Sequence, residues 1–238
     1  MESLHIITPV KDSIESTLRT AKAILGSHID VPFSYTIYND FSTEENTRLL
    51  ENASREMGFT LVNLADLTTH PSPNYLMVLR REQQLCRESG CHLLIVESDV
   101  TVKPDTLQEL ATAATRLPEA GIIAAVTVDE EGDINYPYEF AQKLETGEHD
   151  VRKHLSFCCT LLTTKLLETV DFGLLDETKN WFDVTSSHES LEHGLHNYLL
   201  TRLPVLHQPH ASRPWKKLKY SNPLKYYLKK YTKGLDKI

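Results

Sequence analysis

The sequence has few cysteines and no long apolar run. Its four cysteines, Cys86, Cys91, Cys158 and Cys159, do not have the spacing of a zinc site. A chain of 238 residues can bury a hydrophobic core without disulfide bridges, so we expect four free, buried thiols. No stretch approaches the roughly 20 apolar residues that cross a bilayer. These absences argue against a disulfide-bonded scaffold, a zinc domain and a membrane-spanning chain.

The start of the chain does not have the pattern of a secretory signal peptide. Met1–His5 lacks a basic start, and the apolar run behind it is short. We therefore expect a cytoplasmic protein. Hydrophobic residues make up 40% of the sequence and charged residues 24%, which is ordinary for a globular protein. The length suits one large α/β domain, which we place at residues 1–212, followed by a tail at 213–238.

The tail differs from the rest of the chain in charge. It holds nine Lys or Arg and one acid, whereas the whole chain has a net charge of −8, so residues 1–212 carry −16. Aromatic residues alternate with the basic ones. Such a tail can lie on an anionic membrane surface, at about 1 kcal/mol per basic residue, or it can pack as a helix on the acidic domain. The chain offers no other basic groove, so we expect no nucleic-acid binding.

The central stretch is His92–Val100, an apolar run that ends at two acids, Glu97 and Asp99. The run follows Gly90 and is too short for a helix, which predicts a buried strand. Open α/β sheets bind ligands at the carboxyl ends of their strands, and two carboxylates there suit a divalent cation that holds a phosphate. Hard oxygen ligands favour Mg²⁺ or Mn²⁺ over Zn²⁺. Alternatively, the two acids only mark the end of the strand.

Strand and helix patterns alternate along the chain, which predicts a doubly wound, mostly parallel α/β sheet with helices on both faces. Besides the central strand, strands are expected at 5–10, 33–38, 59–64, 121–128, 155–162 and 203–207. Helices are expected at 14–25, 44–57, 75–89, 104–116, 164–169 and 185–202. Residues 129–153 have an irregular pattern and are candidates for shaping an acceptor pocket.

Local signals predict where several helices begin. Asp12 and Glu15 have the spacing of a capping box for the first helix. Thr43 is a suitable N-cap for the second helix. Pro104 occupies the position favoured by proline at the start of the fourth.

Four motifs follow one another along the chain. They are Ile6–Val10, Asn39–Thr43, the pair Arg81-Glu82 ahead of Glu97–Asp99, and Phe182–Val184 with the later Pro204–His207. From about Leu4 to Ser212 this order resembles the family 2 glycosyltransferases, which have the GT-A nucleotide-diphospho-sugar fold. Asn39–Thr43 is similar to that family's Asp-Asp-Gly-Ser-Thr motif, with Asn39 in place of the first acid. Arg81-Glu82 stands where the family usually has Arg-Asn.

The resemblance implies an enzyme that transfers a sugar from a nucleoside diphosphate to a hydroxyl of a glycan or lipid-linked glycan, with inversion at the anomeric carbon. It implies that the nucleotide-sugar is bound by Thr8, Pro9, Asp40, Arg81, Glu97 and Ser98. Asp40 would bind the nucleoside, beside a base pocket that includes Thr8 and Pro9. Arg81 would lie near the diphosphate, where its planar guanidinium suits phosphate oxygens.

The same resemblance implies a divalent metal, Mn²⁺ or Mg²⁺, as the cofactor. Asp99 would be its main carboxylate ligand and His207 a further ligand or phosphate contact. Glu97, which replaces the family's Asp, would face the ribose or the waters of the metal. A metal in this place stabilises the charge that grows on the departing nucleoside diphosphate.

Asp183 is the implied general base. An acceptor hydroxyl must lose its proton as it attacks the sugar, and a positioned carboxylate that takes it contributes typically 10²–10⁴-fold in rate. Alternatively, Asp183 only caps the helix expected from Thr185. Phe182 stands where the family often has Glu, so Asp176 and Glu189 are the other candidates.

The remaining histidines give weaker signals. His188 and His193 are five residues apart, so on a helix they point about 140° from each other and cannot share a metal. We expect these two and His196 to be helix-surface or packing residues, and His210 to be a solvated loop residue.

Two other functions are open from the sequence. A nucleotidyltransferase on a related fold would need a Gly-rich phosphate loop after the first strand, and residues 8–13 contain no glycine. A non-catalytic relative would bind a glycan or a partner protein through the same cleft.

Overall fold

The computed structural model describes residues 2–178, 181–208 and 224–227. The chain divides into two compact units, Met1–Gln208 and Pro209–Ile238, and the first unit carries the α/β fold. Within the second unit, residues 224–227 form a helical turn. The predicted boundary after residue 212 and most of the predicted tail lie outside the described residues.

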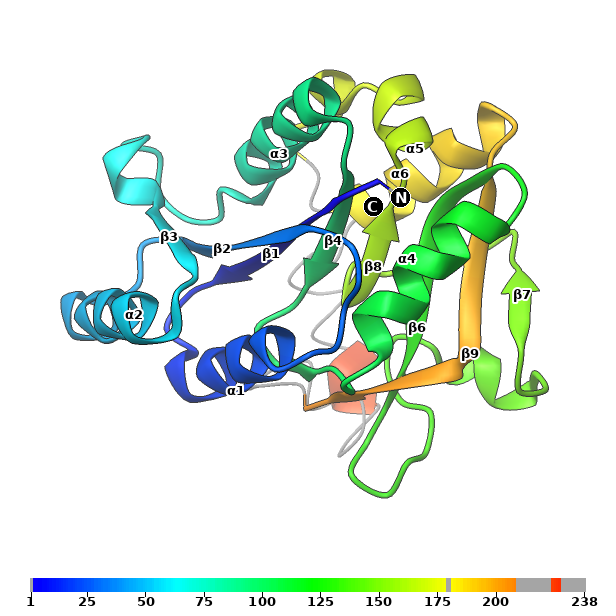
Figure 1. Cartoon of the computed structure of the whole chain (residues 1–238), viewed down its shortest axis with the longest axis horizontal. Coiled ribbons are helices and arrows are strands. Elements are labelled where there is room, and N and C mark those ends of the chain that lie inside the picture. The colour runs from blue at the N-terminus through cyan, green and yellow to red at the C-terminus, as the bar shows by residue number, and fades with distance from the viewer. Residues whose placement is uncertain (1, 179–180, 209–223, 228–238) are drawn as a thin grey trace. The chain divides into compact units, whose positions relative to one another are not determined.

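The centre of the first unit is a sheet. Among the described residues, nine strands form it in the order β3-β2-β1-β4-β8-β6-β9-β5, with β7 paired to β9. They are β1 (Leu4–Val10), β2 (Phe33–Asn39), β3 (Thr60–Asn63), β4 (His92–Val96), β5 (Val100–Thr101), β6 (Ala120–Val128), β7 (Glu148–Asp150), β8 (Cys159–Leu162) and β9 (His196–His207). Strands β3, β2, β1 and β4 are parallel, as are β6 and β9, whereas β5, β7 and β8 run antiparallel to their neighbours. The prediction of a mostly parallel α/β sheet is confirmed (Figure 1).

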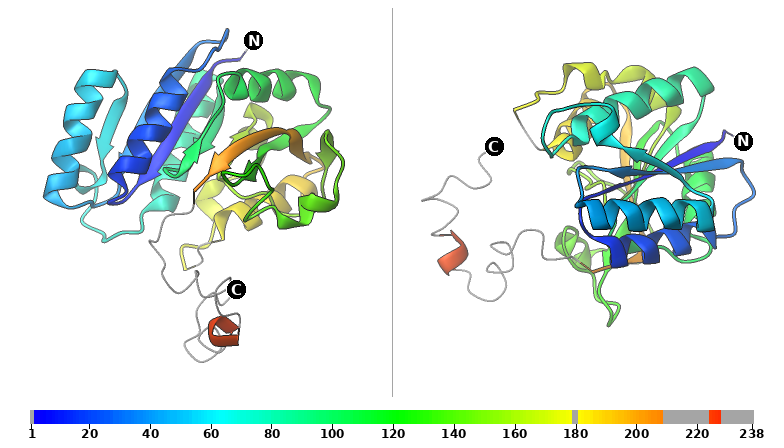
Figure 2. Two further views of the ribbon diagram at one scale, coloured as in Figure 1. Left: turned by 90° about the horizontal axis from the view of Figure 1, so that it is seen from below. Right: turned by 90° about the vertical axis from the view of Figure 1, so that its left-hand side faces the viewer.

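Helices cover both faces of this sheet, as Figure 2 shows for α1 and α2 on one side and α3 on the other. They are α1 (Ile14–Leu25), α2 (Glu44–Met57), α3 (Tyr75–Ser89), α4 (Thr106–Arg116), α5 (Thr164–Thr169) and α6 (Phe182–Glu192). Short 3-10 helices lie at η1 (Leu64–Asp66), η2 (Glu139–Lys143) and η3 (Phe172–Leu174). Helices α1, α2 and α4 pack on what we call the α1 face, and α3, α5 and α6 on the α3 face.

The strands supply both hydrophobic layers because successive side chains point to opposite faces. In β6, Ile122 packs into the α3 face and Ile123 into the α1 face, and both are fully buried. Burying one such side chain contributes about 1.5–3 kcal/mol. In β4, Ile95 faces α3 and Val96 faces α1, so this strand is apolar on both sides up to the acids that follow it.

Helices α1, α2, α3 and α5 have the predicted limits. Thr43 accepts a hydrogen bond from the Asn46 backbone N–H at 3.3 Å, which caps α2 as predicted. Gly58 and Gly90 end α2 and α3 with φ angles of 83° and 64°, a left-handed conformation that other residues adopt only with strain.

The predicted cap of α1 and the predicted start of α4 are wrong. Asp12 does not cap α1, because its backbone has a φ of 56° and its carboxylate accepts hydrogen bonds from the N–H of Thr43 at 2.7 Å and from Asn46 at 3.0 Å. Asp12 therefore ties the loop after β1 to the start of α2. Helix α4 begins at Thr106, so Pro104 lies ahead of the helix instead of in its first turn.

The predicted helix at 185–202 is also wrong. Helix α6 ends at Glu192, Gly194 turns the chain with a φ of 77°, and β9 runs from His196 to His207. Leucines in this stretch fit a helix or a buried strand equally well, and pairing with β6 decides for the strand. The register between β6 and β9 shifts after the pair Ala125↔Leu200. The second half of β9 then pairs with β6 in a new register. The predicted strand at 155–162 is shorter, since β8 begins at Cys159.

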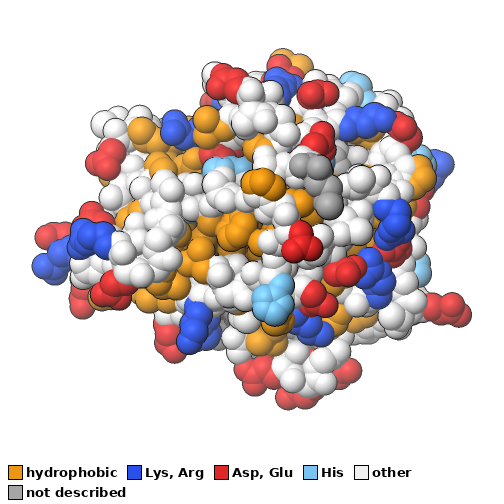
Figure 3. All heavy atoms as spheres, in the orientation of Figure 1, with side chains coloured by type: hydrophobic (Ala, Val, Ile, Leu, Met, Phe, Trp, Pro, Cys, Tyr) orange, Lys and Arg blue, Asp and Glu red, His pale blue; other side chains and the backbone are white. Residues whose placement is uncertain are grey.

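Charged and apolar side chains share the surface of this unit. On the face drawn in Figure 3, acidic and basic side chains are interspersed around a central strip of hydrophobic ones. None of the described helices combines the length and the apolar character of a membrane span.

The cap of α2 gives a test of this fold. Replacing Thr43 with Ala removes the acceptor for the Asn46 N–H and should lower the free energy of unfolding by about 0.5–2 kcal/mol in denaturant titrations. The control is Ser13→Ala, because Ser13 occupies the same position in α1 without a side-chain capping bond. Equal losses in both variants would contradict the cap.

Candidate functional site

A turn after β4 places the two central acids. The Val100 N–H donates to the Glu97 carbonyl at 3.1 Å, which closes a turn from Glu97 to Val100. The chain then enters β5, where Val100 pairs with His207 of β9, and the Gln208 N–H donates to the Asp99 carbonyl at 3.0 Å. These bonds bring the end of β9 beside the acids.

Strand β8 brings a cysteine to the same place. The Glu97 N–H donates to the Cys158 carbonyl at 2.8 Å, one residue before Cys159 pairs with Val96 of β4. The Cys158 thiol donates to Glu97 Oε2 at 3.2 Å. The residue just before β8, Cys158, is therefore placed against the turn that holds the acids.

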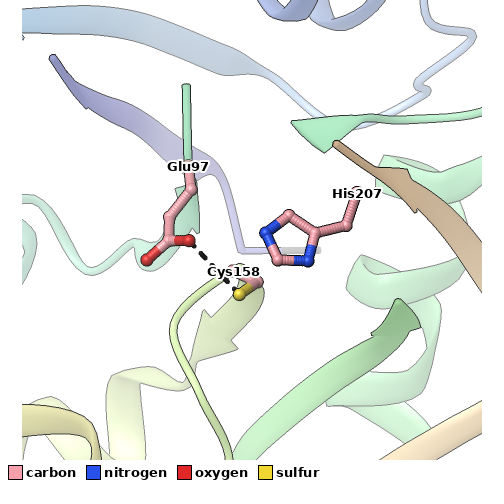
Figure 4. Close-up of side chains that lie close together, drawn as sticks. All are labelled: Glu97, Cys158 and His207. Carbon is pink, nitrogen blue, oxygen red and sulfur yellow. Dashed lines mark hydrogen bonds between the residues drawn. The ribbon is translucent and has the colours of Figure 1, made fainter. Parts of the chain in front are cut away.

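Four side chains form what we call the donor cluster: Glu97, Asp99, Cys158 and His207. One ligand atom from each of Glu97, Cys158 and His207 lies within 4.8 Å of the others. Figure 4 shows these three side chains gathered in one place. His207 Nε2 is 3.7 Å from Asp99 Oδ1. Cys158 and His207 are buried and Glu97 is half-buried. The predicted approach of Asp99, Glu97 and His207 is present, and Cys158 joins them.

The imidazole of His207 is held in one orientation. Its Nδ1 is 2.8 Å from the Tyr136 carbonyl oxygen, which can only accept a hydrogen bond. The hydrogen of the neutral ring is therefore on Nδ1, and Nε2 presents its lone pair to the cluster. This second-sphere contact is the usual support of a histidine that binds a metal. Two carboxylates, an imidazole and a thiol are a donor set that fits a divalent cation.

Without a cation, the acidic groups of the donor cluster destabilise one another's deprotonated forms. Burial, and then the charge of Asp99, raises the pKa of Glu97. Burial, and then the charge of Glu97, raises the pKa of the Cys158 thiol. A bound cation reverses both effects, because it favours the deprotonated form of every ligand.

Asp183 lies in the first turn of α6 and not at its N-cap, which is Trp181. Its Oδ1 accepts the Val184 N–H at 2.9 Å. Burial raises the pKa of Asp183 above the ordinary value. Burial is the main cause that raises the pKa of Glu97 and of Tyr75, and the charge of Asp183 adds to it in both cases, so the Asp183 carboxylate is near the donor cluster.

Tyr75, at the start of α3, was not among the predicted site residues. Its ring packs against Phe157 and Phe182 at centroid distances of 6.5 and 6.2 Å. Its buried hydroxyl makes no hydrogen bond to any residue that the structure describes. Burial, and then the charges of Glu97 and Asp183, raises its pKa, so the hydroxyl lies near both acids.

Asp40 has a structural task in this fold. Its carboxylate accepts hydrogen bonds from the Ser72 hydroxyl at 2.8 Å, the Asn74 N–H at 2.9 Å and the Asn74 side chain at 2.8 Å. Since Asn74 is the N-cap of α3, Asp40 fixes the start of the helix that carries Tyr75. A carboxylate has about four acceptor positions, so capacity for a ligand remains.

The other predicted nucleotide-binding residues do not belong to the donor cluster. Thr8 is fully buried on the α1 face, where its hydroxyl accepts from Tyr35 at 3.0 Å, and Pro9 follows it in β1. Arg81 is exposed on α3 and donates to the Tyr38 hydroxyl at 3.2 Å. Ser98 is buried inside the turn between Glu97 and Asp99.

The alternative bases and the remaining histidines have other contacts. Asp176 accepts from the backbone and the hydroxyl of Thr178 at 2.9 and 2.7 Å, and Glu189 is 3.8 Å from His193. His196 lies on β9, not on a helix as predicted, 2.6 Å from Asp150. His210 lies outside the described residues.

The role of Asp40 can be tested by stability. Asp40→Asn replaces one accepting oxygen with an amide that cannot accept, which should lower the free energy of unfolding by about 1–3 kcal/mol. Asp66→Asn, an exposed change in η1, is the matched control and should be near neutral. If both variants unfold at the wild-type denaturant concentration, Asp40 does not fix the start of α3.

Solved structures resemble this chain, whereas no family model and no curated protein matches its sequence. TarS 1–349 of S. aureus has a TM-score of 0.64 at 15% identity, covering 87% of this chain and 60% of that one. The mannosyltransferase PcManGT of Pyrobaculum calidifontis, in complex with GDP-Man and Mn²⁺, has a TM-score of 0.65 at 12% identity, covering 96% and 64%. GalNAc-T7 with UDP, GalNAc and Mn²⁺ has a TM-score of 0.64 at 12% identity, covering 87% and 44%. This chain thus spans less than two thirds of each of these neighbours, and the likeness establishes the predicted GT-A fold; membership of family 2 stays a prediction.

Proposed function

We propose that this chain is a metal-dependent glycosyltransferase that moves a sugar from a nucleoside diphosphate to a hydroxyl of a glycan or lipid-linked glycan, with inversion. The observation that carries the proposal is the convergence of Glu97, Asp99 and His207 at the ends of β4 and β9 in a GT-A fold. Two neighbours with this fold were solved with Mn²⁺ and a nucleotide or nucleotide-sugar. The donor cluster supports the same kind of ligand here.

In this proposal Asp99 and His207 hold the cation, Mn²⁺ or Mg²⁺, with Glu97 beside it. The Tyr136 carbonyl keeps Nε2 of His207 aimed at that place. The bound cation supplies charge stabilisation for the departing diphosphate. The fixed ligands need no rearrangement as that charge develops, which is the advantage of a preorganised site.

Asp183 is the proposed base. Its carboxylate takes the proton of the acceptor hydroxyl as the oxygen attacks the anomeric carbon. Burial raises the pKa of Asp183, which makes it a stronger base than a solvated aspartate. The Tyr75 hydroxyl, which has no hydrogen-bond partner among the described residues, is proposed to hydrogen-bond the sugar or the acceptor.

The remaining assignments follow from the family resemblance. Thr8, Pro9 and Asp40 are proposed to contact the nucleoside, and Arg81 and Ser98 the diphosphate. Thr8 can contribute through its backbone, since its side chain is held by Tyr35. Contact of the tail at 213–238 with a membrane, and a location in the cytoplasm or at the inner face of its membrane, are further proposals.

Metal binding is tested by calorimetry with uridine and guanosine diphosphates, with and without Mn²⁺. Asp99→Asn should weaken Mn²⁺-dependent nucleotide binding by at least about 10–100-fold, because a ligand of the cation is lost. Asp105→Asn is the control, an exposed change at the N-cap of α4 that should not alter binding. Absence of metal-dependent binding of any nucleotide to the wild type would favour a non-catalytic binding protein.

The base is tested by separating binding from turnover. Asp183→Asn should keep Mn²⁺-dependent nucleotide binding and lower transfer by roughly 10²–10⁴-fold. Asp176→Asn, in a different loop, should retain both. Because the active form is the deprotonated carboxylate and its pKa is raised, wild-type kcat/KM should fall with decreasing pH before an ordinary aspartate would be protonated. Full activity in Asp183→Asn would refute the assignment.

The donor itself is found by screening nucleotide-sugars for hydrolysis in the presence of Mn²⁺. Slow hydrolysis of one donor above the background of the Asp99→Asn variant would identify both the sugar and the nucleotide.

A further inference from the structure

We propose that Cys158 is a ligand of the bound cation, as a thiolate, and that it shifts the metal preference of the site from Mg²⁺ toward softer divalent cations such as Zn²⁺ and Co²⁺. This inference rests on the proposed function only in using the same cation. It concerns which atoms bind the metal, and it is testable without nucleotide or transfer.

The geometry of the donor cluster suits a shared cation. Cys158 Sγ is 3.2 Å from Glu97 Oε2, and its distance to the ligand nitrogen of His207 is within 4.8 Å. Metal bonds of about 2.0–2.3 Å at tetrahedral angles place neighbouring ligand atoms about 3.6 Å apart. The sulfur therefore needs only a small shift to complete the coordination sphere. Asp99, 3.7 Å from His207, supplies a fourth protein donor.

The position of Cys158 is fixed by the backbone. Its carbonyl accepts the Glu97 N–H, and the next residue pairs in register with Val96. The thiol is 2% exposed and is 3.4 Å from the Ser156 hydroxyl. A cation bound by Asp99 and His207, with Glu97 beside it, would therefore lie next to the sulfur, because the buried thiol cannot turn toward solvent.

The preference for softer divalent cations follows from the chemistry of sulfur. Mg²⁺ and Mn²⁺ favour carboxylate, carbonyl and water oxygens, whereas thiolates select softer cations such as Zn²⁺. On binding, the thiol gives up its proton and a sulfur–metal bond forms, with the proton passing to solvent. One thiolate and one imidazole among four donors predict binding of Zn²⁺ and Co²⁺ well above that of Mg²⁺.

The test uses the full chain and Co²⁺, whose thiolate complexes absorb in the near ultraviolet by charge transfer. The wild type should develop this band on titration with Co²⁺. Cys158→Ser should lose the band and bind Zn²⁺ about 10–100-fold more weakly in competition with a chromogenic chelator. Cys159→Ser is the matched control, an adjacent buried cysteine outside the donor cluster, and should keep both.

Zinc-edge X-ray absorption of the wild type provides a second measurement that needs no variant. It should contain one sulfur at about 2.3 Å. The proposal is overturned if the wild type binds no Co²⁺, if it binds Co²⁺ without the band, if the band survives in Cys158→Ser, or if zinc has no sulfur neighbour. Failure of nucleotide binding with an intact band would instead refute the proposed function and leave the thiolate ligand in place.

Discussion

The short pairing of β5 with β9 is the contact on which the site depends. It joins Val100 to His207, and the hydrogen bond from Gln208 to Asp99 extends it by one step. The acids and the imidazole belong to segments far apart in the chain, and no local signal brings them together. Once these backbone bonds form, His207 is beside Asp99 and its ring is oriented by Tyr136.

The elements that could be predicted from the sequence are those with local signals at their ends. Thr43 and Gly58 bound α2, Gly90 ends α3, and each acts within a few residues of its own position. The helix expected at 185–202 failed because its leucines obtain their burial from β6, not from their own turn spacing. The prediction of Asp12 as a cap was wrong because of contacts with a distant segment as well, since its hydrogen bonds go to the start of α2.

The residues of the site also divide into those that the sequence could indicate and those that it could not. Glu97 and Asp99 are recognisable because an apolar strand stops at them, and His207 because a known family has a histidine there. Cys158 gave no signal, since its place depends on β8 running antiparallel between β4 and β6, and spacing between cysteines does not report such a pairing. Tyr75 gave none either, because its position is set by Asp40 through Asn74.

Asp40 and the donor cluster are therefore connected through the fold. Asp40 fixes the start of α3, α3 places Tyr75, and the Tyr75 hydroxyl lies near both Glu97 and Asp183. Burial is the main cause that raises the pKa of Glu97, of Asp183 and of the Cys158 thiol, and the charge of Asp99 adds to it at Glu97 and that of Glu97 at Cys158. A group that binds the folded state and not the unfolded chain stabilises the fold. The proposed cation would contact side chains at the end of β4, at the start of β8 and at the end of β9, so its binding would couple metal affinity to the stability of the strand pairings that create the site.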